Sequence, residues 1–345
     1  MLPFAIALQR AITADPHENV CWSPYSVAHA LRLLATEAGG LTRDELVAAL
    51  LGDKAADLTA FATVLATASE LLAPDYADPP ELAVSSALWA DPSLGIARAR
   101  SAPFLSAPGE ARTLINDDVA AVTRGLITNL IEEPPMGAAS ALVSALYLKC
   151  GWVTAFEDTT SARFRTPAGK KQVPTMRLVS DDLGYAATDD WQVVNLPAVG
   201  GVRAVVLLPY GDLTQFEPTL TADTVADLLA APVLRNVDLR LPAFTVSSRV
   251  ELTAPLADLG VRTAFTADAD LGDLGVALDT VPHQAVLTVA EKGIEGAAAT
   301  AAIAWMSGTD EEPVVVKVER PFLFAVQHVA TGVLYFLARI TDPVT

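Results

Sequence analysis

Histidine is the side chain that most often serves as a general base near neutral pH, and this chain has only four histidines. They are His17, His29, His283 and His328. We predict a structural role for each, since three of them fall in or beside predicted helices and strands. No nucleophile elbow, phosphate-binding loop, dinucleotide fingerprint or zinc-protease motif occurs. A Ser-His-Asp site assembled from distant residues is the alternative, but the sequence gives no support for an enzyme.

Paired carboxylates could act as general acids or bind metal ions. Adjacent carboxylates occur at Asp117-Asp118, Asp189-Asp190 and Glu311-Glu312. We interpret these pairs as solvated loop residues. The only cysteines, Cys21 and Cys150, are too few for a disulfide framework or an all-cysteine zinc site, and we expect them to be small buried side chains. We therefore predict no catalytic residue, no metal and no cofactor.

The composition limits the possible partners. The chain of 345 residues carries 23 Lys and Arg against 41 Asp and Glu, which gives a formal net charge of −18. Nucleic acids and anionic membranes attract concentrated basic residues, so we exclude both as main partners. With 52% apolar and 19% charged residues, the chain can bury a large core and is not disordered.

The apolar character also raises the question of a membrane segment. A spanning helix needs about 20 mostly apolar residues. The longest uncharged stretch, Pro321 to Ala338, is interrupted by Gln327, His328 and Thr331, and we interpret it as two buried strands around a turn. Met1 to Leu8 has no leading positive charge, so no secretory signal is recognised. We expect a cytoplasmic protein, or an extracellular one if the start of the sequence is truncated.

Helical patterns dominate the first third of the chain. Apolar residues recur at helical spacing from Phe4 to Ile12. Ser23-Pro24 predicts a second helix start, because the serine oxygen can cap an N–H and proline suits the first helical position. Thr42 to Glu45 has the pattern of a capping box that opens a third helix. A further helix is predicted from Thr123 to Ile131.

Strand-like segments fill the rest of the chain. They are Arg203–Pro209, Val237–Leu241, Ala285–Ala290, Val314–Val318, Phe322–Val329 and Val333–Ile340. The last three follow one another too closely for intervening helices, so these strands are predicted to be mostly antiparallel. Helices first and strands later predict the α+β class. Without internal repeats or a Gly/Ser-rich linker, we expect one domain over residues 1–345.

The segment from Glu291 to Pro313 connects two predicted strands by about twenty residues, which is uncommon inside a compact domain unless the connection is functional or disordered. A flexible linker would be rich in glycine, serine or charge. This segment instead holds mostly alanine between Gly296 and Trp305. One interpretation is an alanine-rich surface helix, and the other is a strand awaiting a place in a sheet.

As a strand, this segment has two distinct faces. One face carries Ile294, Gly296, Ala298, Thr300, Ala302 and Ala304, and the other carries Glu295, Ala297, Ala299, Ala301, Ile303 and Trp305. The first face has no charge, and the only charged residue between Gly293 and Trp305 is Glu295, on the second. This pattern favours a strand that enters the middle of a sheet, where small residues fit among side chains that are already packed.

Several short motifs, in a fixed order from about Phe4 to Pro343, resemble those of the serpin family. They are N-V-C-W-S-P-Y-S at 19–26, L-V-S-A-L-Y-L-K-C-G-W at 142–152, V-V-N-L-P at 193–197, L-P-A-F at 241–244, L-x-x-L-G-V-x-x-A-F at 256–265, H-Q-A-V-L-T-V-A-E-K-G at 283–293 and R-P-F-L-F at 320–324. Each motif alone is weak, and their shared order makes the resemblance specific. The chain resembles a serine protease inhibitor of the prokaryotic kind.

The resemblance implies an α+β fold with three mostly antiparallel sheets, about nine helices and an exposed reactive-centre loop over residues 291–313. Serpins offer this loop to a protease, whose nucleophile forms an acyl-enzyme with it. The cut loop then inserts into the main sheet as a new strand, and the attached protease is distorted before deacylation. The expected partner is a target protease in a covalent acyl complex with a monomeric inhibitor. The alternative is a non-inhibitory serpin that acts as a binding or structural module.

By this resemblance, the hinge is Glu291 to Gly293 and the inserting strand is Ile294 to Trp305. Ser23, Ser26 and His283 match the polar cluster that the family keeps beneath the central strands. Trp152 matches the tryptophan beneath the top of the sheet, where insertion begins. From the residues alone, these four would be a helix cap, a first-turn hydroxyl, a strand histidine and a core tryptophan, and both sets of roles can hold together.

The family's spacing also places the cleaved bond. Counted from the hinge glutamate, the bond is Ser307-Gly308, and a shift of one residue gives Met306-Ser307. No Lys or Arg lies between Lys292 and Lys317, so a protease that requires a basic residue is a poor candidate. The expected targets are chymotrypsin-, elastase- or subtilisin-like serine proteases, or alternatively a cysteine protease.

Some positions depart from the family pattern. Ser144 stands where most members have Asn, Cys150 where Gly is usual, and Ala155 where Pro is usual. Ala243 replaces a Lys that in some members pairs with the hinge glutamate, which would leave Glu291 without that partner.

The hinge departs at two further positions. Ile294 replaces the usual Thr or Ser, and Gly296 replaces the usual Ala. Ile is uncharged and favours strands, and Gly costs only about 0.5–1 kcal/mol relative to Ala. Neither change resembles the charged or proline-rich hinges of non-inhibitory members, so the sequence favours insertion.

Overall fold

In a computed structural model of the chain, the described residues are 1–73, 78–133, 136–272, 277–295 and 312–343. Eight α-helices lie within these ranges, which confirms the α+β class and is close to the expected helix number. They are α1 (Leu2–Ile12), α2 (Pro24–Glu37), α3 (Gly40–Leu51), α4 (Leu58–Ser69), α5 (Pro108–Val122), α6 (Leu213–Phe216), α7 (Ala222–Ala230) and α8 (Thr253–Asp258). Three short 3₁₀ helices accompany them: η1 (Pro92–Leu94), η2 (Glu217–Thr219) and η3 (Thr263–Phe265).

One sheet has nine strands in the order β1-β15-β14-β8-β7-β6-β9-β13, with β5 paired to β6. Its strands are β1 (Val20–Trp22), β5 (Asp158–Thr166), β6 (Gly169–Ala187), β7 (Trp191–Ala198), β8 (Val202–Pro209), β9 (Val233–Pro242), β13 (Val314–Lys317), β14 (Phe322–His328) and β15 (Leu334–Ile340). The predicted strands at the end of the chain are confirmed. Every residue of β14 and β15 is buried, which explains their nearly continuous apolar sequence.

The second sheet has six strands in the order β10-β11-β12-β4-β2-β3. They are β10 (Phe244–Glu251), β11 (Pro282–Ala290), β12 (Gly293–Ile294), β4 (Ser140–Gly151), β2 (Glu81–Ala90) and β3 (Arg100–Ser101). β4 is mostly apolar because both of its faces are covered. Ala141, Val143 and Ala145 pack in the cluster that contains α5, whereas Leu142, Leu146 and Leu148 belong to the main core with α2.

The expectation of three separate sheets needs one correction, because two of the expected sheets are hydrogen-bonded to each other. The 19-residue strand β6 pairs with β5 at its beginning and with β7 at its end. Its register with β9 shifts between Ser180 and Leu183, where the strand is irregular. A long strand that bends in this way continues from one layer into the next.

The helix starts predicted from local patterns are partly confirmed. α1 covers the predicted segment, and the Ser23 side chain accepts the N–H of Ser26 at 3.1 Å at the start of α2. The capping box at Thr42 to Glu45 is wrong, because α3 begins at Gly40 with no side-chain cap. Both side chains serve tertiary contacts instead. Thr42 accepts the N–H of Asp270 at 3.0 Å, and Glu45 accepts the N–H of Thr263 at 2.7 Å.

The helix predicted from Thr123 to Ile131 is also wrong. Helix α5 ends at Val122, and the next residues form turns with positive φ at Arg124 (54°) and Gly125 (82°). The Thr123 hydroxyl accepts the N–H of Ile127 at 3.2 Å, which holds the chain in a tight turn. Such local bonds compete with the helix.

Helix α5 also changes the interpretation of one carboxylate pair. Asp117 and Asp118 lie within α5 rather than on a loop. The Asp118 carboxylate forms an ion pair with Arg100 on β3, the strand that pairs with β2, so this carboxylate lies on a helix surface that faces the edge of the sheet. Glu311 lies outside the described residues.

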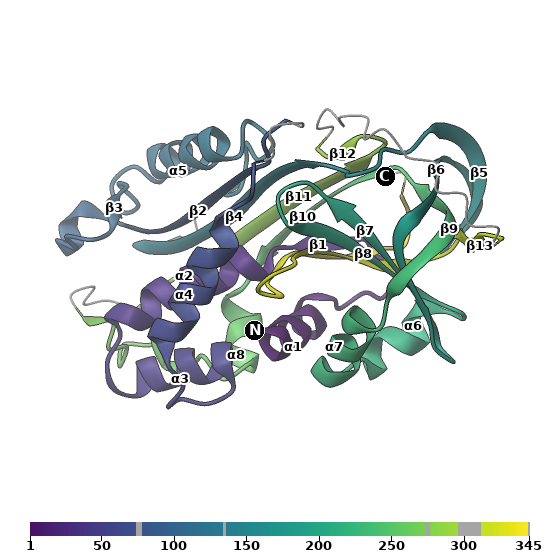
Figure 1. Cartoon of the computed structure of the whole chain (residues 1–345). Helices are drawn as coiled ribbons and strands as arrows, with labels where there is room; N and C mark the ends of the chain where they lie inside the picture. Colours follow the sequence, from purple (N-terminus) through teal and green to yellow (C-terminus); the bar gives the residue numbers. More distant parts are fainter. Residues whose placement is uncertain (74–77, 134–135, 273–276, 296–311, 344–345) are drawn as a thin grey trace.

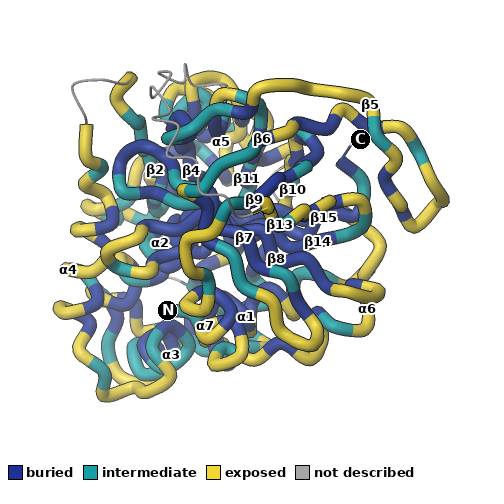
Figure 2. Tube along the Cα trace, turned by 45° about the vertical axis from the view of Figure 1, so that its right-hand side comes forward, coloured by how far each residue is buried: buried dark blue, intermediate teal, exposed yellow. Residues whose placement is uncertain are grey.

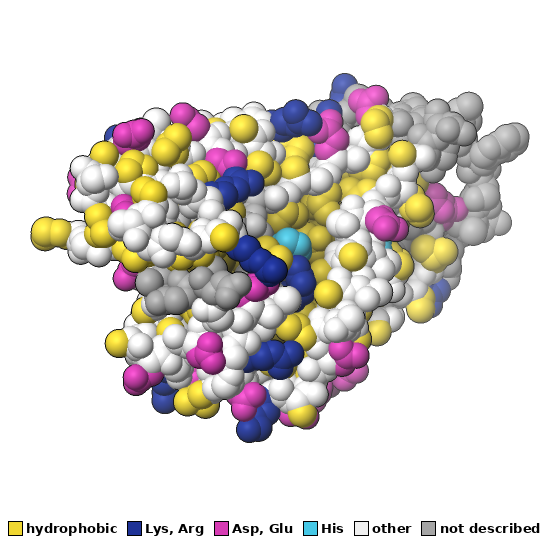
Figure 3. All heavy atoms as spheres, turned by 90° about the vertical axis from the view of Figure 1, so that its left-hand side faces the viewer, with side chains coloured by type: hydrophobic (Ala, Val, Ile, Leu, Met, Phe, Trp, Pro, Cys, Tyr) yellow, Lys and Arg dark blue, Asp and Glu magenta, His cyan; other side chains and the backbone are white. Residues whose placement is uncertain are grey.

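The two sheets and the helices form layers. Helix α5 covers one face of β2 and β4, and α2 lies on the other side of these strands (Figure 1). Buried residues run through the central strands, and exposed residues concentrate on loops and outer helices (Figure 2). Figure 3 shows one surface of the molecule, where basic and acidic side chains are scattered around a hollow with hydrophobic side chains. Among the described residues, no helix is both long and apolar enough to cross a membrane.

Candidate functional site

The predicted hinge leads into a short strand in the middle of the six-stranded sheet. β12 lies between β11 and β4 and is antiparallel to both (Figure 1). Ile294 lies opposite Val289 on β11 and Cys150 on β4. The Ile294 side chain is 1% exposed and belongs to the main core. The first position of the predicted inner face is therefore already buried in the sheet.

Trp152 and its neighbours hold the turn that precedes β12. The Trp152 indole Nε1–H donates to the Ala290 carbonyl oxygen at 2.9 Å, and its backbone N–H donates to the Lys292 carbonyl oxygen at 3.0 Å. The Phe156 N–H donates to the Glu291 carbonyl oxygen, also at 3.0 Å. The carbonyl oxygens of three consecutive residues, Ala290 to Lys292, are thus held by the segment that follows β4. Trp152 therefore fixes the turn in addition to packing in the core.

Gly293 allows β12 and β4 to approach closely. A Cβ atom at this position would lie 2.3 Å from the Cys150 carbonyl oxygen and 2.8 Å from Cα of Gly151. Both contacts are with backbone, so a side chain here would force β4 or β12 to move. The Cys150 side chain is fully buried in the core, and burial raises the pKa of its thiol to about 12. This cysteine is therefore a packing residue, as its sequence predicted.

Glu291 has a partner that the sequence did not reveal. The Thr159 hydroxyl, on β5, donates a hydrogen bond to Glu291 Oε1. This bond, together with the backbone N–H of Glu291 itself, lowers the pKa of the carboxyl group. A neutral hydroxyl from β5 is thus a hydrogen-bond partner of this carboxylate. Lys292, next in the turn, is exposed.

Glu295 follows β12 and is the last described residue of this part of the chain. Its N–H still donates to the Thr288 carbonyl oxygen of β11 at 2.9 Å, but its φ is +58°, a conformation that non-glycine residues rarely adopt. Burial raises the pKa of its carboxyl group, and the Tyr147 hydroxyl and Lys149 oppose that rise only in part. Carboxylate oxygen Oε2 is buried without a hydrogen-bond partner. The side chain is therefore held in an unfavourable place for a charge.

A second group of predicted residues meets lower in the sheet. The Ser23 backbone N–H donates to Nε2 of His283 at 3.0 Å, so Nε2 carries no proton. The proton is then on Nδ1, which lies 3.0 Å from the Ser144 carbonyl oxygen and 2.9 Å from its hydroxyl. Burial lowers the pKa of His283 to about 4. Ser26 joins this cluster only through Ser23, to whose carbonyl oxygen its hydroxyl donates at 3.4 Å.

The same cluster closes the sheet below β12. His283 on β11 and Ser144 on β4 are paired residues in a parallel ladder that continues to Ala285 and Leu146. β11 and β4 are therefore direct neighbours at this level and are separated by β12 at their upper end. An arrangement of this kind can accept more strand only if the direct β11–β4 pairing is broken.

Several predicted residues lie outside the described part of the chain. These are the inserting residues Gly296, Ala297, Ala298, Ala299 and Thr300, and the cleavage window Met306, Ser307 and Gly308. Among the described residues, His283 hydrogen-bonds to two serines and to no carboxylate, and it is 0% exposed. Among the described residues, no group of three or more His, Cys, Asp and Glu is arranged to hold a metal ion.

Comparison with known proteins agrees with this geometry. A model described as Serpin (serine protease inhibitor) matches residues 2–343. The chain is 29% identical to an uncharacterized serpin-like protein of Thermococcus kodakarensis, with 96% of this chain and 82% of the relative covered. It is also 29% identical to alpha-1-antichymotrypsin of Homo sapiens, with 99% and 86% covered. Relatives from an archaeon and a mammal are thus equally similar, and the prokaryotic kind stays an expectation.

The fold is also similar to solved structures. The thermophilic serpin tengpin in its native state has a TM-score of 0.83 at 22% identity, with 99% of this chain and 92% of that chain covered. The family model spans nearly the whole sequence and describes protease inhibitors rather than enzymes, which confirms the expectation that the chain is not an enzyme. The chain therefore belongs to the serpin family.

Proposed function

We propose that the chain is an inhibitory serpin that acts as a single-use substrate of a serine endopeptidase. The observation that carries the proposal is β12. The hinge is already seated between β11 and β4, and Ile294 is buried at the first position of the predicted inner face. The residues that follow on that face up to Ala304 are small and uncharged.

In this mechanism, the serine hydroxyl of the protease attacks a carbonyl carbon in the Met306 to Gly308 window. An ester bond to the protease forms, the peptide bond breaks, and the new amino terminus on the distal side is released. The loop is then free at one end, while Glu291 to Ile294 keep it anchored in the sheet. Insertion from Gly296 onward would carry the protease away along β4 and β11 before water cleaves the ester.

Insertion requires the separation of β4 from β11 below β12. The pairing of Ala285 with Leu146, next to β12, must break first, and the contacts of His283 with Ser144 must break after it. We propose that Ser23, Ser26 and His283 control this opening, and that Trp152 holds the turn about which Glu291, Lys292 and Gly293 act as a hinge. The broken bonds are replaced because an inserted strand has backbone partners on both sides.

The window suggests the class of target. Met306 would suit a hydrophobic specificity pocket, and the absence of Lys and Arg between Lys292 and Lys317 disfavours proteases that require a basic residue. The name of one relative, alpha-1-antichymotrypsin, points in the same direction. We therefore propose chymotrypsin-, elastase- or subtilisin-like proteases as targets.

The test is to incubate the chain with chymotrypsin, elastase and subtilisin and to analyse the products by denaturing gel and intact mass. The proposal predicts an SDS-stable complex with at least one protease and a released fragment that begins at Ser307 or Gly308. Cleavage in this window by all three proteases without any complex would instead favour a non-inhibitory serpin that acts as a binding module.

A further inference from the structure

Two arginines that are distant in sequence line one pocket of 370 Å³, on a part of the molecule that the hinge does not use. Arg165 is near the end of β5, and Arg320 lies just before β14. The backbone N–H of Arg165 donates to the Glu319 carbonyl oxygen at 2.8 Å, so the two arginine-bearing segments are held side by side.

Among the described residues, no carboxylate forms an ion pair with Arg165 or Arg320. Arg320 is half-buried, and its Nε–H donates to the Pro209 carbonyl oxygen at 2.6 Å. Burial lowers the pKa of Arg320; Glu319 opposes this, and the positive charge of Arg165 adds to it. The positive charge of Arg165 therefore adds to the cost of burying the Arg320 charge.

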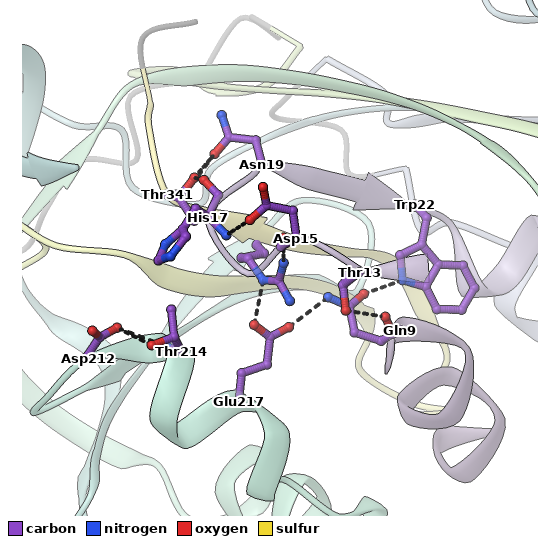
Figure 4. Close-up of polar contacts among 11 residues, drawn as sticks. Gln9, Thr13, Asp15, His17, Asn19, Trp22, Asp212, Thr214, Glu217 and Thr341 are labelled. Carbon is purple, nitrogen blue, oxygen red and sulfur yellow. Dashed lines mark hydrogen bonds and ion pairs between the residues drawn. The ribbon is translucent and has the colours of Figure 1, made fainter. Parts of the chain in front are cut away.

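The rest of the wall mixes apolar residues, among them Leu213 and Pro321, with polar residues that are held in place. Asp212, the carboxylate that lines the pocket, is occupied in its own turn, where Oδ1 accepts the N–H of Thr214 at 3.0 Å and its hydroxyl at 2.9 Å (Figure 4). The Thr341 hydroxyl donates to the His17 carbonyl oxygen at 2.7 Å, which fixes the loop that carries the His17 ring. The pocket lining thus includes two arginines and one histidine against one aspartate.

We infer that this pocket binds a small oxyanion with two or more negative charges, of the phosphate-ester or polycarboxylate class, held between Arg165 and Arg320. Planar guanidinium groups match both phosphate and carboxylate oxygens, and such charge-assisted hydrogen bonds are stronger than neutral ones. The volume suits a small metabolite rather than a macromolecule. The chain has a net charge of −18 and as a whole repels anions, so the local excess of positive charge at this pocket would attract anions to this place on the surface.

The inference is tested on the full chain by calorimetric titration with inorganic phosphate and with citrate, in a chloride buffer of constant ionic strength. Wild type should bind at least one probe, and the probe that binds identifies the class. Arg165→Gln should weaken that binding by about tenfold or more, because one charge-assisted partner is lost. Arg163→Gln is the matched control, since Arg163 is exposed on the same strand two residues away and does not line the pocket.

A second measurement does not depend on a variant. The bound probe should protect Arg165 of wild type from phenylglyoxal, and Arg163 should react equally with and without probe. Absence of binding by both probes, an equal loss in Arg163→Gln, or equal protection of both arginines would overturn the inference. Binding through diffuse surface charge alone would be weakened equally by Arg163→Gln and would decrease as salt is added.

Discussion

His283 on β11 lies opposite Ser144 on β4, and its Nδ1 is 3.0 Å from the Ser144 carbonyl oxygen. The other ring nitrogen accepts the backbone N–H of Ser23 at the start of α2. One buried imidazole therefore joins β4 and β11, the two strands that would separate in the proposed insertion, to helix α2. Opening the sheet at this level would leave buried polar groups unpaired for a time, which makes the contact a barrier as well as a structural bond.

The first prediction concerns pH. Burial lowers the pKa of folded His283 from its ordinary 6.5 to about 4. The unfolded state binds the extra proton first, so the stability given by the neutral ring is complete above pH 6.5 and is lost as the pH falls toward 4. The loss is at most about 3 kcal/mol. Unfolding measured in urea from pH 7 to pH 4 should show a shallower decline in His283→Gln than in wild type. Parallel curves would mean that the imidazole does not titrate in this way.

A second prediction concerns the close approach at the hinge. Gly293→Ala places a methyl group against the backbone of Cys150 and Gly151, and overpacking of this kind costs about 1–3 kcal/mol. Thermal unfolding should show the loss, and the fraction of cleaved chain that traps a protease should fall. Gly109→Ala is the control, because nothing lies within 4 Å of a Cβ there and its φ is not positive. Equal stability of the two variants would argue against the seated hinge.

A third prediction concerns a buried ion pair far along the chain from the hinge. Arg339 Nε lies 2.5 Å from Glu217 Oε2, with the two side chains 4% and 8% exposed, and Gln9 donates to the other carboxylate oxygen (Figure 4). Glu217→Ala leaves a buried arginine without a counter-charge and should cost about 3–5 kcal/mol. Asp44→Ala removes the exposed partner of Lys54 and should cost less than about 1 kcal/mol. Denaturant titration would separate these values, and similar losses would contradict the prediction.

A fourth prediction tests the two faces of the inserting segment. Thr300→Arg puts a charge on the face predicted to be buried, whereas Ala299→Arg puts the same charge on the opposite face. Both positions lie outside the described residues. Thr300→Arg should be cleaved by the target protease with little covalent complex, and Ala299→Arg should keep more trapping activity. The ratio of complex to cleaved chain on a denaturing gel measures this. Undiminished trapping by Thr300→Arg would contradict the assignment of Thr300 to the buried face.

Local sequence rules predicted those elements that depend on local contacts. The start of α2 follows from Ser23-Pro24, and β14 and β15 follow from their apolar runs. The capping box at Thr42 failed because a distant segment, near Asp270, takes the hydroxyl. Helix α5 was missed because polar residues, among them two adjacent aspartates, interrupt its apolar pattern, and its buried face is defined by contact with β2 and β4.

The site was predictable to a similar extent. The family motifs placed Glu291 to Gly293 and His283, but the Thr159 partner of Glu291 comes from β5, more than a hundred residues earlier. The alternating pattern that begins at Ile294 could not predict that this residue is already buried, because such a pattern does not show whether a strand is paired. The φ of Glu295 depends in the same way on the strands on either side.

The most direct test of the insertion mechanism is the thermal stability of the chain before and after cleavage in the Met306 to Gly308 window. An inserted strand adds backbone pairing and burial on both sides, so cleaved protein should melt at least about 10 °C higher than intact protein. Calorimetry of the two forms, with the cut confirmed by intact mass, gives the answer. An unchanged or lower melting temperature would show that the loop does not enter the sheet and would contradict the inhibitory mechanism.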